Sequence, residues 1–263
     1  MKYPLNIRAA VLEKNKSPLI IRKVIFKGPL KAGQVLIKLF YSGICGKQIE
    51  EIDGLGGVDP YIPHLLGHEG TGEVLDVGHG VDKVNVGDKV VLHWMEGSGL
   101  NSETPIYEYE DRRINAGWVT TFNDHAVVSE NRITKIDDND DMKIGALFGC
   151  AVTTGVGVAL NEADIKPDHS VVIFGCGGVG LFAIQGAKLL NPKQIIAVDI
   201  NDEALTLAED FGASSTINAS KADPIQVIRE LTNGNGAERV IIVTGNKKAI
   251  ETAVQCASIP GEC

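Results

Sequence analysis

The clearest chemical pattern in this chain is the glycine-rich turn in VVIFGCGGVGLFA. Gly175, Gly177 and Gly180 have GxGxxG spacing, an apolar strand-like run precedes them, and a run with helical spacing follows. In that setting the first glycine allows a tight turn, the second lets the backbone approach a pyrophosphate, and the third lets the helix pack closely on the strand. The helix start at Gly178 and Val179 offers unpaired N–H groups to phosphates. The pattern predicts a dinucleotide site.

Asp199 bears on which dinucleotide is bound. It ends the next apolar run, QIIAVD, 19 residues after Gly180. A carboxylate there can accept hydrogen bonds from both ribose hydroxyls of NAD but repels the 2′-phosphate of NADP. Ile200, Asn201 and Asp202 supply no arginine or lysine to receive that phosphate. The sequence therefore favours NAD.

Cysteine and histidine supply a second group of candidates. The five cysteines are widely spread, odd in number and without a CxxC pair, which does not describe a disulfide framework in a cytosolic chain. Cys45 in GICGKQIE and His68 in GHEG are each, taken alone, more often packed or hydrogen-bonded structural residues than metal ligands. From the residues alone, both roles stay open.

Composition and charge bound the class of protein. The chain has 263 residues, 44% of them hydrophobic and 22% charged, and a net charge of −9. No basic patch indicates nucleic acid or an anionic membrane as a partner, and no run is apolar enough to span a membrane. The N-terminus lacks the pattern of a signal peptide, so we expect a cytoplasmic protein.

Two patterns of secondary structure follow one another along the chain. Up to about residue 130, short β-rich runs alternate with glycine and proline turns, which indicates a mostly antiparallel, barrel-like unit. We expect a long loop or lobe at 95–123. After about residue 150, strands alternate with helices, which predicts a parallel α/β sheet. The pattern stops part-way through, so we expect that the chain is truncated.

Several motifs together resemble those of the medium-chain, zinc-dependent alcohol dehydrogenases. They are SGICG (42–46), GHEGTGEV (67–74), GDKVV (87–91), GCAVTTG (149–155) and GCGGVG with its aspartate. The resemblance implies a GroES-like β-barrel catalytic domain at 1–153 and an incomplete Rossmann NAD-binding domain at 154–263. It also implies hydride transfer between NAD and a small alcohol or its aldehyde or ketone.

The resemblance further implies roles for individual residues. Cys45, His68 and Cys150 would hold one catalytic zinc, a ligand set that suits Zn²⁺ and leaves a position open for substrate. Glu69 would lie next to the metal ligands without binding the zinc itself, or would bind the zinc transiently during ligand exchange. Thr154 would pack against the nicotinamide. Trp94 would wall the substrate pocket.

Three departures from the family pattern qualify these expectations: the missing cysteines of 95–123, the expected truncation, and the residues after Cys45. The segment 95–123 has no cysteine, so we expect no structural zinc, and the lobe is ordered by contacts such as those of Trp118, Tyr107 and Tyr109. Where the family has a serine or threonine and a histidine for proton transfer, this chain has Lys47 and Glu50, which we take as catalytic candidates.

In place of the family's aspartate beside the ligand histidine stands Gln48. The full-length protein is expected to form a homodimer or homotetramer. Two alternatives stay open: a zinc-independent quinone or enone reductase, and a non-catalytic NAD(H)-binding protein on the same scaffold.

Overall fold

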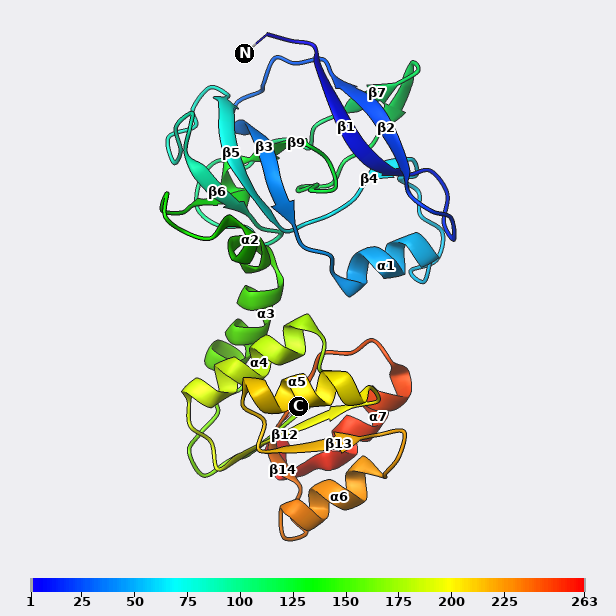
Figure 1. The fold of residues 1–263 in the computed structure, drawn as a ribbon, viewed down its shortest axis with the longest axis vertical. Coiled ribbons are helices and arrows are strands. Elements are labelled where there is room, and N and C mark those ends of the chain that lie inside the picture. The colour runs from blue at the N-terminus through cyan, green and yellow to red at the C-terminus, as the bar shows by residue number, and fades with distance from the viewer. Residues whose placement is uncertain (1, 263) are drawn as a thin grey trace. The chain divides into compact units, whose positions relative to one another are not determined.

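The structure of the chain is a computed structural model that describes residues 2–262, and their side chains except those of 259–262. The chain divides into two compact units, one ending at Cys150 and the other beginning at Ala151 (Figure 1). Each carries its own hydrophobic core.

The first unit is built on two mainly antiparallel sheets. One has the order β4-β1-β2-β7-β8 and the other β10-β6-β5-β3-β9. Their strands are β1 (Leu5–Leu12), β2 (Ile20–Phe26), β3 (Gln34–Ser42), β4 (His64–Leu65), β5 (Gly70–Val77), β6 (Lys89–Leu92), β7 (Tyr107–Tyr109), β8 (Arg112–Ile114), β9 (His125–Ser129) and β10 (Ile133–Lys135). The GroES-like barrel implied by the motifs is present.

Alternation along β3 places side chains in two apolar clusters of this unit. Val35 and Ile37 pack in one cluster, and Leu36 between them packs in the other. A strand that turns successive side chains to opposite faces can hold both clusters at once. Short helices complete the unit: α1 (Gly46–Asp53), η1 (Glu130–Arg132), α2 (Met142–Gly145) and η2 (Ala146–Gly149).

The segment 95–123 is more regular than the loop we expected. It contains the hairpin β7–β8, whose register pairs Tyr107 with Ile114. Tyr107 is fully buried, its hydroxyl accepts the Val127 N–H at 3.2 Å, and Arg22 stacks on Tyr109. Trp118 stacks with Arg132. The three aromatic residues therefore order the lobe, as expected.

The second unit contains a five-stranded parallel sheet in the order β13-β12-β11-β14-β15. Its strands are β11 (Ser170–Phe174), β12 (Gln194–Asp199), β13 (Ser215–Asn218), β14 (Ala237–Ile242) and β15 (Ala257–Glu262). Its helices are α3 (Ala151–Gly157), η3 (Val158–Glu162), α4 (Gly178–Leu189), α5 (Asp202–Phe211), α6 (Pro224–Leu231) and α7 (Lys247–Cys256).

Both faces of this sheet are covered. Val171 and Ile173 of β11 pack in a cluster with α4 and α5, while Val172 and Phe174 pack in a cluster with α6 and α7. This explains why β11 reads as a continuous apolar run. The strand order reverses beside β11, and in such sheets ligands bind at the carboxyl ends of the strands near that point.

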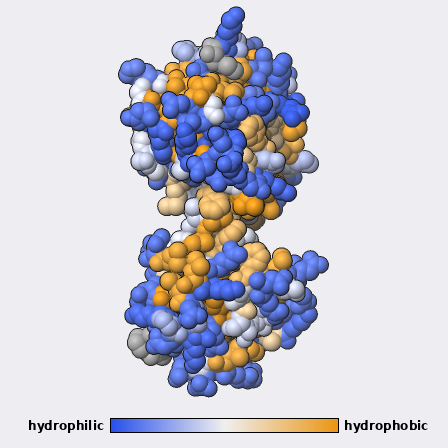
Figure 2. Space-filling model, turned by 60° about the vertical axis from the view of Figure 1, so that its left-hand side comes forward, coloured by the Kyte–Doolittle hydropathy of each residue, from blue (hydrophilic) through white to orange (hydrophobic). Residues whose placement is uncertain are grey.

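On the face shown in Figure 2, both units expose hydrophobic as well as hydrophilic side chains. Within residues 2–262 no single helix has the length and apolarity to cross a membrane. A bent pair, Met142–Gly149 with Ala151–Glu162, meets the requirement only when its halves are counted together, by length and composition alone.

Candidate active site

The pairing of β3 with β5 brings Cys45 and His68 to one edge of a sheet. The antiparallel register places Ser42, at the end of β3, opposite Gly70, at the start of β5. The Gly43 N–H continues the ladder to the Glu69 carbonyl at 3.2 Å. Cys45 follows β3 and His68 precedes β5, so the two side chains meet although 23 residues separate them.

Gly149 brings Cys150 to the same edge. Leu92 of β6 pairs with Gly70, and the Trp94 N–H donates to the Gly149 carbonyl at 3.3 Å. A Cβ at Gly149 would collide with the Leu92 carbonyl oxygen and with Glu69. Only glycine permits this close approach, and Cys150 follows it directly.

The ligand atoms of Cys45, His68 and Cys150 all lie within 4.8 Å of one another. Within residues 2–262 they form the one such cluster of three potential metal ligands. His68 Nε2 is buried and has no hydrogen-bond partner. Burial also lowers the pKa of His68, which favours the neutral imidazole that a metal requires. A buried, unpartnered nitrogen beside two cysteine sulfurs fits Zn²⁺.

Gln48 joins two of these ligands and lies beside His68, the position at which the family resemblance placed it. Its Oε1 accepts the Cys45 N–H at 2.9 Å, and its Nε2 lies 2.5 Å from His68 Nδ1. The side chain is 2% exposed. A glutamine three residues after the N-cap residue Cys45 can reach back to the N-cap backbone N–H, as in a capping box.

The catalytic candidates Lys47 and Glu50 lie on the exposed side of α1. Their ammonium and carboxylate are 3.7 Å apart, and both side chains are about half exposed. Glu69, in contrast, is 2% exposed, and a Cβ at either Gly43 or Gly149 would collide with it. Glu69 thus packs against the segments that carry Cys45 and Cys150. The catalytic roles of all three stay predictions.

A pocket of about 510 Å³ adjoins His68 within the first unit. Gln48, His68, Leu66 and Trp118 contribute to its lining. Trp94, the predicted wall residue, is not among the lining residues, and its side chain is 46% exposed. The large aromatic side chains that line this pocket are those of Tyr61 and Trp118.

The glycine turn of the second unit has the geometry its sequence predicted. Gly175 follows β11 with φ +97°, and a Cβ at Gly180 would collide with the Gly175 carbonyl oxygen. A Cβ at Gly177 would meet nothing within 4 Å. The turn therefore leaves open space at Gly177, where α4 begins with Gly178 and Val179. The turn fits a pyrophosphate against the unpaired first N–H groups of α4.

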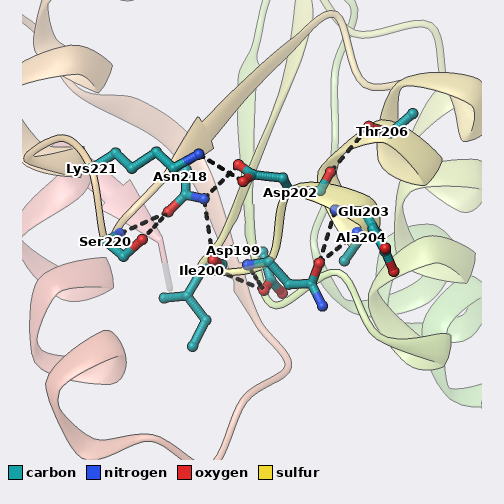
Figure 3. Close-up of polar contacts among 10 residues, drawn as sticks. Asp199, Ile200, Asp202, Glu203, Ala204, Thr206, Asn218, Ser220 and Lys221 are labelled. Carbon is teal, nitrogen blue, oxygen red and sulfur yellow. Dashed lines mark hydrogen bonds and ion pairs between the residues drawn. The ribbon is translucent and has the colours of Figure 1, made fainter.

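Asp199 is fixed by backbone donors at the end of β12. Its carboxylate accepts the N–H of Cys176 at 2.7 Å, of Ile200 at 2.7 Å and of Asn201 at 3.0 Å. Asp199 and Gly175 line a pocket of about 520 Å³ (Figure 3 shows Asp199 and its neighbours). Burial, and then the nearby Asp199 charge, raises the pKa of the Cys176 thiol to about 12, consistent with a packed thiol.

Thr154 lies on α3 of the second unit and lines another pocket, of about 390 Å³, with residues 240–243 at the end of β14. Its hydroxyl is buried and lacks a hydrogen-bond partner. An unpartnered buried hydroxyl at a pocket wall is suited to contact a bound group.

Family comparisons agree with this geometry. The family model "Alcohol dehydrogenase GroES-like domain" matches residues 31–138, and "Zinc-binding dehydrogenase" matches residues 178–263. Alcohol dehydrogenase 6 of Peromyscus maniculatus is 33% identical over 285 residues, which cover 98% of this chain and 76% of that protein. S-(hydroxymethyl)glutathione dehydrogenase of Synechocystis sp. is 33% identical over 279 residues, covering 95% and 74%.

Solved structures of alcohol dehydrogenases also resemble this chain. Benzyl alcohol dehydrogenase from Acinetobacter calcoaceticus superposes with a TM-score of 0.85 at 28% identity, covering 98% of this chain and 75% of that one. An alcohol dehydrogenase zinc-binding domain protein from Burkholderia ambifaria gives 0.86 at 26% identity, covering 97% and 75%.

A GroES-like unit with a Cys–His–Cys cluster, followed by a Rossmann-type sheet, defines a medium-chain oxidoreductase. The chain belongs to the zinc-dependent alcohol dehydrogenase family. It is an alcohol dehydrogenase-like oxidoreductase.

Proposed function

We propose that this protein transfers a hydride between a small primary or secondary alcohol and NAD, with zinc held by Cys45, His68 and Cys150. The observation that carries the proposal is the buried, unpartnered His68 Nε2 next to two cysteine sulfurs. When bound, zinc supplies Lewis acidity, which makes the hydroxyl of an alcohol substrate more acidic, and NAD accepts the hydride.

The residues of the first unit bind and orient the alcohol. The substrate hydroxyl is directed to the Cys45–His68–Cys150 cluster, and its carbon chain lies in the pocket lined by Leu66 and Trp118. Gln48 holds the backbone of Cys45 and the ring of His68. We propose that Lys47, paired with Glu50, places a positive charge near the substrate oxygen and so favours its deprotonated form.

The residues of the second unit bind the cofactor. The first turn of α4 receives the pyrophosphate, and the Asp199 carboxylate accepts a ribose hydroxyl with the lone pairs that its backbone donors leave. Thr154 contacts the nicotinamide end with its unpartnered hydroxyl. The carboxylate at Asp199 favours NAD over NADP by charge.

The test is alcohol-dependent reduction of NAD⁺ by the purified protein, followed through NADH absorbance. The screen begins with alcohols of the kinds that relatives are named for, including benzyl alcohol. We expect turnover in the wild type and its loss in Cys45→Ser. NADH binding without any turnover would favour a non-catalytic protein, and zinc-independent reduction of quinones or enones would favour the reductase alternative.

A further inference from the structure

A lysine that sequence reasoning overlooked lies at the rim of the nucleotide pocket. Lys221 follows β13, and its Nζ is 2.6 Å from Asp202 Oδ2 (Figure 3). Its near neighbours Ala219 and Ala222 line the pocket that also holds Asp199. Because β12 and β13 are adjacent and parallel, with Asp199 opposite Asn218, their carboxyl ends meet at this rim.

Asp202 and Asn218 hold the rim in a defined arrangement. The Asn218 Nδ2 donates to Asp202 Oδ1 at 2.7 Å and to the Ile200 carbonyl at 3.1 Å. Asn218 Oδ1 in turn accepts the N–H of Ser220 at 2.9 Å and its hydroxyl at 2.6 Å. Both carboxylate oxygens of Asp202 are therefore engaged, one by Asn218 and the other by Lys221.

The charges of this rim determine how it meets a 2′-phosphate. The Lys221 ammonium and the Asp202 carboxylate balance one another, and the ion pair and the Asn218 hydrogen bond lower the pKa of Asp202, which keeps it ionised. Two further charged residues line the pocket, Asp223 and Lys248, and their charges are opposite in sign. Asp199 then remains as a net negative charge beside the ribose position. A phosphate carries about −1.5 to −2 charge near neutral pH, so it meets net repulsion although a lysine is close.

We propose that Asp202 is a specificity-determining residue that excludes NADP by neutralising Lys221. This inference rests on the proposed use of NAD. Without the Asp202 charge, Lys221 offsets Asp199, and its ammonium is free to pair with a phosphate on the adenosine ribose. With Asp202 present, the same lysine links the loop after β13 to the start of α5.

The test is calorimetric titration of the full chain with NADH and with NADPH at low ionic strength. Asp202→Asn keeps an oxygen for Asn218 and removes only the charge. We expect it to tighten NADPH binding by about tenfold, equivalent to about 1.4 kcal/mol, and to leave NADH binding close to that of the wild type. Glu203→Gln, which removes the adjacent carboxylate on α5, serves as the matched control and should not produce this gain.

A second variant isolates the lysine. In Asp202→Asn combined with Lys221→Gln the gain for NADPH should disappear. A gain that persists there, or that Glu203→Gln reproduces, overturns the inference, because simple loss of negative charge would then explain it. Unchanged NADPH binding in Asp202→Asn, with NADH still bound, overturns the inference alone. A wild type that fails to bind NADH overturns the proposed NAD function as well.

Discussion

The side-chain amide of Gln48 lies 2.5 Å from His68 Nδ1 while its oxygen accepts the Cys45 N–H. When His68 Nε2 binds a metal, the ring proton resides on Nδ1 and requires an acceptor. The Gln48 oxygen can turn toward the ring only by turning its NH₂ toward the Cys45 N–H. A carboxylate at this position could accept both donors at once, so we expect the glutamine to limit zinc affinity.

We therefore predict that Gln48→Glu binds zinc more tightly than the wild type by about tenfold, and that Gln48→Ala binds it more weakly by about 10- to 100-fold. Competition with a chromogenic chelator measures both affinities. If Gln48→Glu weakened zinc binding, the amide would be the better partner of His68, and the reasoning from proton positions would be wrong.

Glu130 should be a main stabilising residue of the first unit. It is fully buried, and its carboxylate accepts the backbone N–H groups of Asp82, Lys83 and Leu100 at 2.7–2.8 Å. An amide provides a single acceptor atom, so Glu130→Gln should lower the free energy of unfolding by about 2–3 kcal/mol. Glu103→Gln, at an exposed surface pair, is the matched control in chemical denaturation.

Glu130 also gives a prediction for pH. Burial raises its pKa, but the three backbone donors outweigh burial and hold it below the ordinary value. The stability that ionised Glu130 contributes to the fold is therefore complete above the unfolded-state pKa of about 4.3. That contribution is lost as pH falls through the lower folded-state pKa. Acid unfolding should show a smaller stability loss in Glu130→Gln than in the wild type. Parallel pH curves for the two proteins would contradict this role.

Two glycines of the nucleotide turn should respond differently to alanine. Gly177→Ala adds a methyl group to open space, so the melting temperature should stay unchanged. NADH affinity should fall by about tenfold or more, because the methyl group would occupy the phosphate position. Gly180→Ala forces a collision with the Gly175 carbonyl and should destabilise the second unit by about 1–3 kcal/mol. Equal melting temperatures for the two variants would rule out this division of roles.

Lys47 should act through its charge. We predict that Lys47→Met lowers kcat by about 10- to 100-fold, whereas Lys47→Arg retains most of the activity. Zinc content and NADH affinity should be unchanged in both, which separates a role in turnover from a role in folding. Equal kcat values for wild type and Lys47→Met would make the lysine a bystander on the exposed face of α1.

Periodicity located most strands and helices because the apolar pattern of each element follows its burial. β11 is continuously apolar and is covered on both faces, whereas β3 divides its side chains between two clusters. The hairpin β7–β8 was missed for a physical reason. Its turn residues Glu110 and Asp111 have φ of +48° and +59°, a conformation that Asn-Gly usually signals. Aspartate is found in such turns, but without an adjacent glycine the pair Glu110 and Asp111 gives only a weak turn signal.

The sequence predicted some residues of the candidate site but not all of their contacts. Cys45, His68 and Cys150 were named from motifs, and the register of β3 with β5 explains why they meet. The resemblance placed Gln48 beside His68, but its bond to Cys45 depends on which side of α1 faces the ligands. Lys221 was not singled out because its ion pair with Asp202 depends on which strand ends adjoin. Such tertiary neighbours leave little trace in the local pattern.

The most direct measurement is the zinc content of purified protein, determined for the wild type, Cys45→Ser, Cys150→Ser and the control Cys256→Ser. Cys256 is a buried thiol on α7 of the second unit, outside the cluster. We predict about one zinc per chain in the wild type and the control, and loss of zinc in the two cluster variants. A wild type without zinc, or cluster variants that keep it, would contradict the assignment of the metal centre.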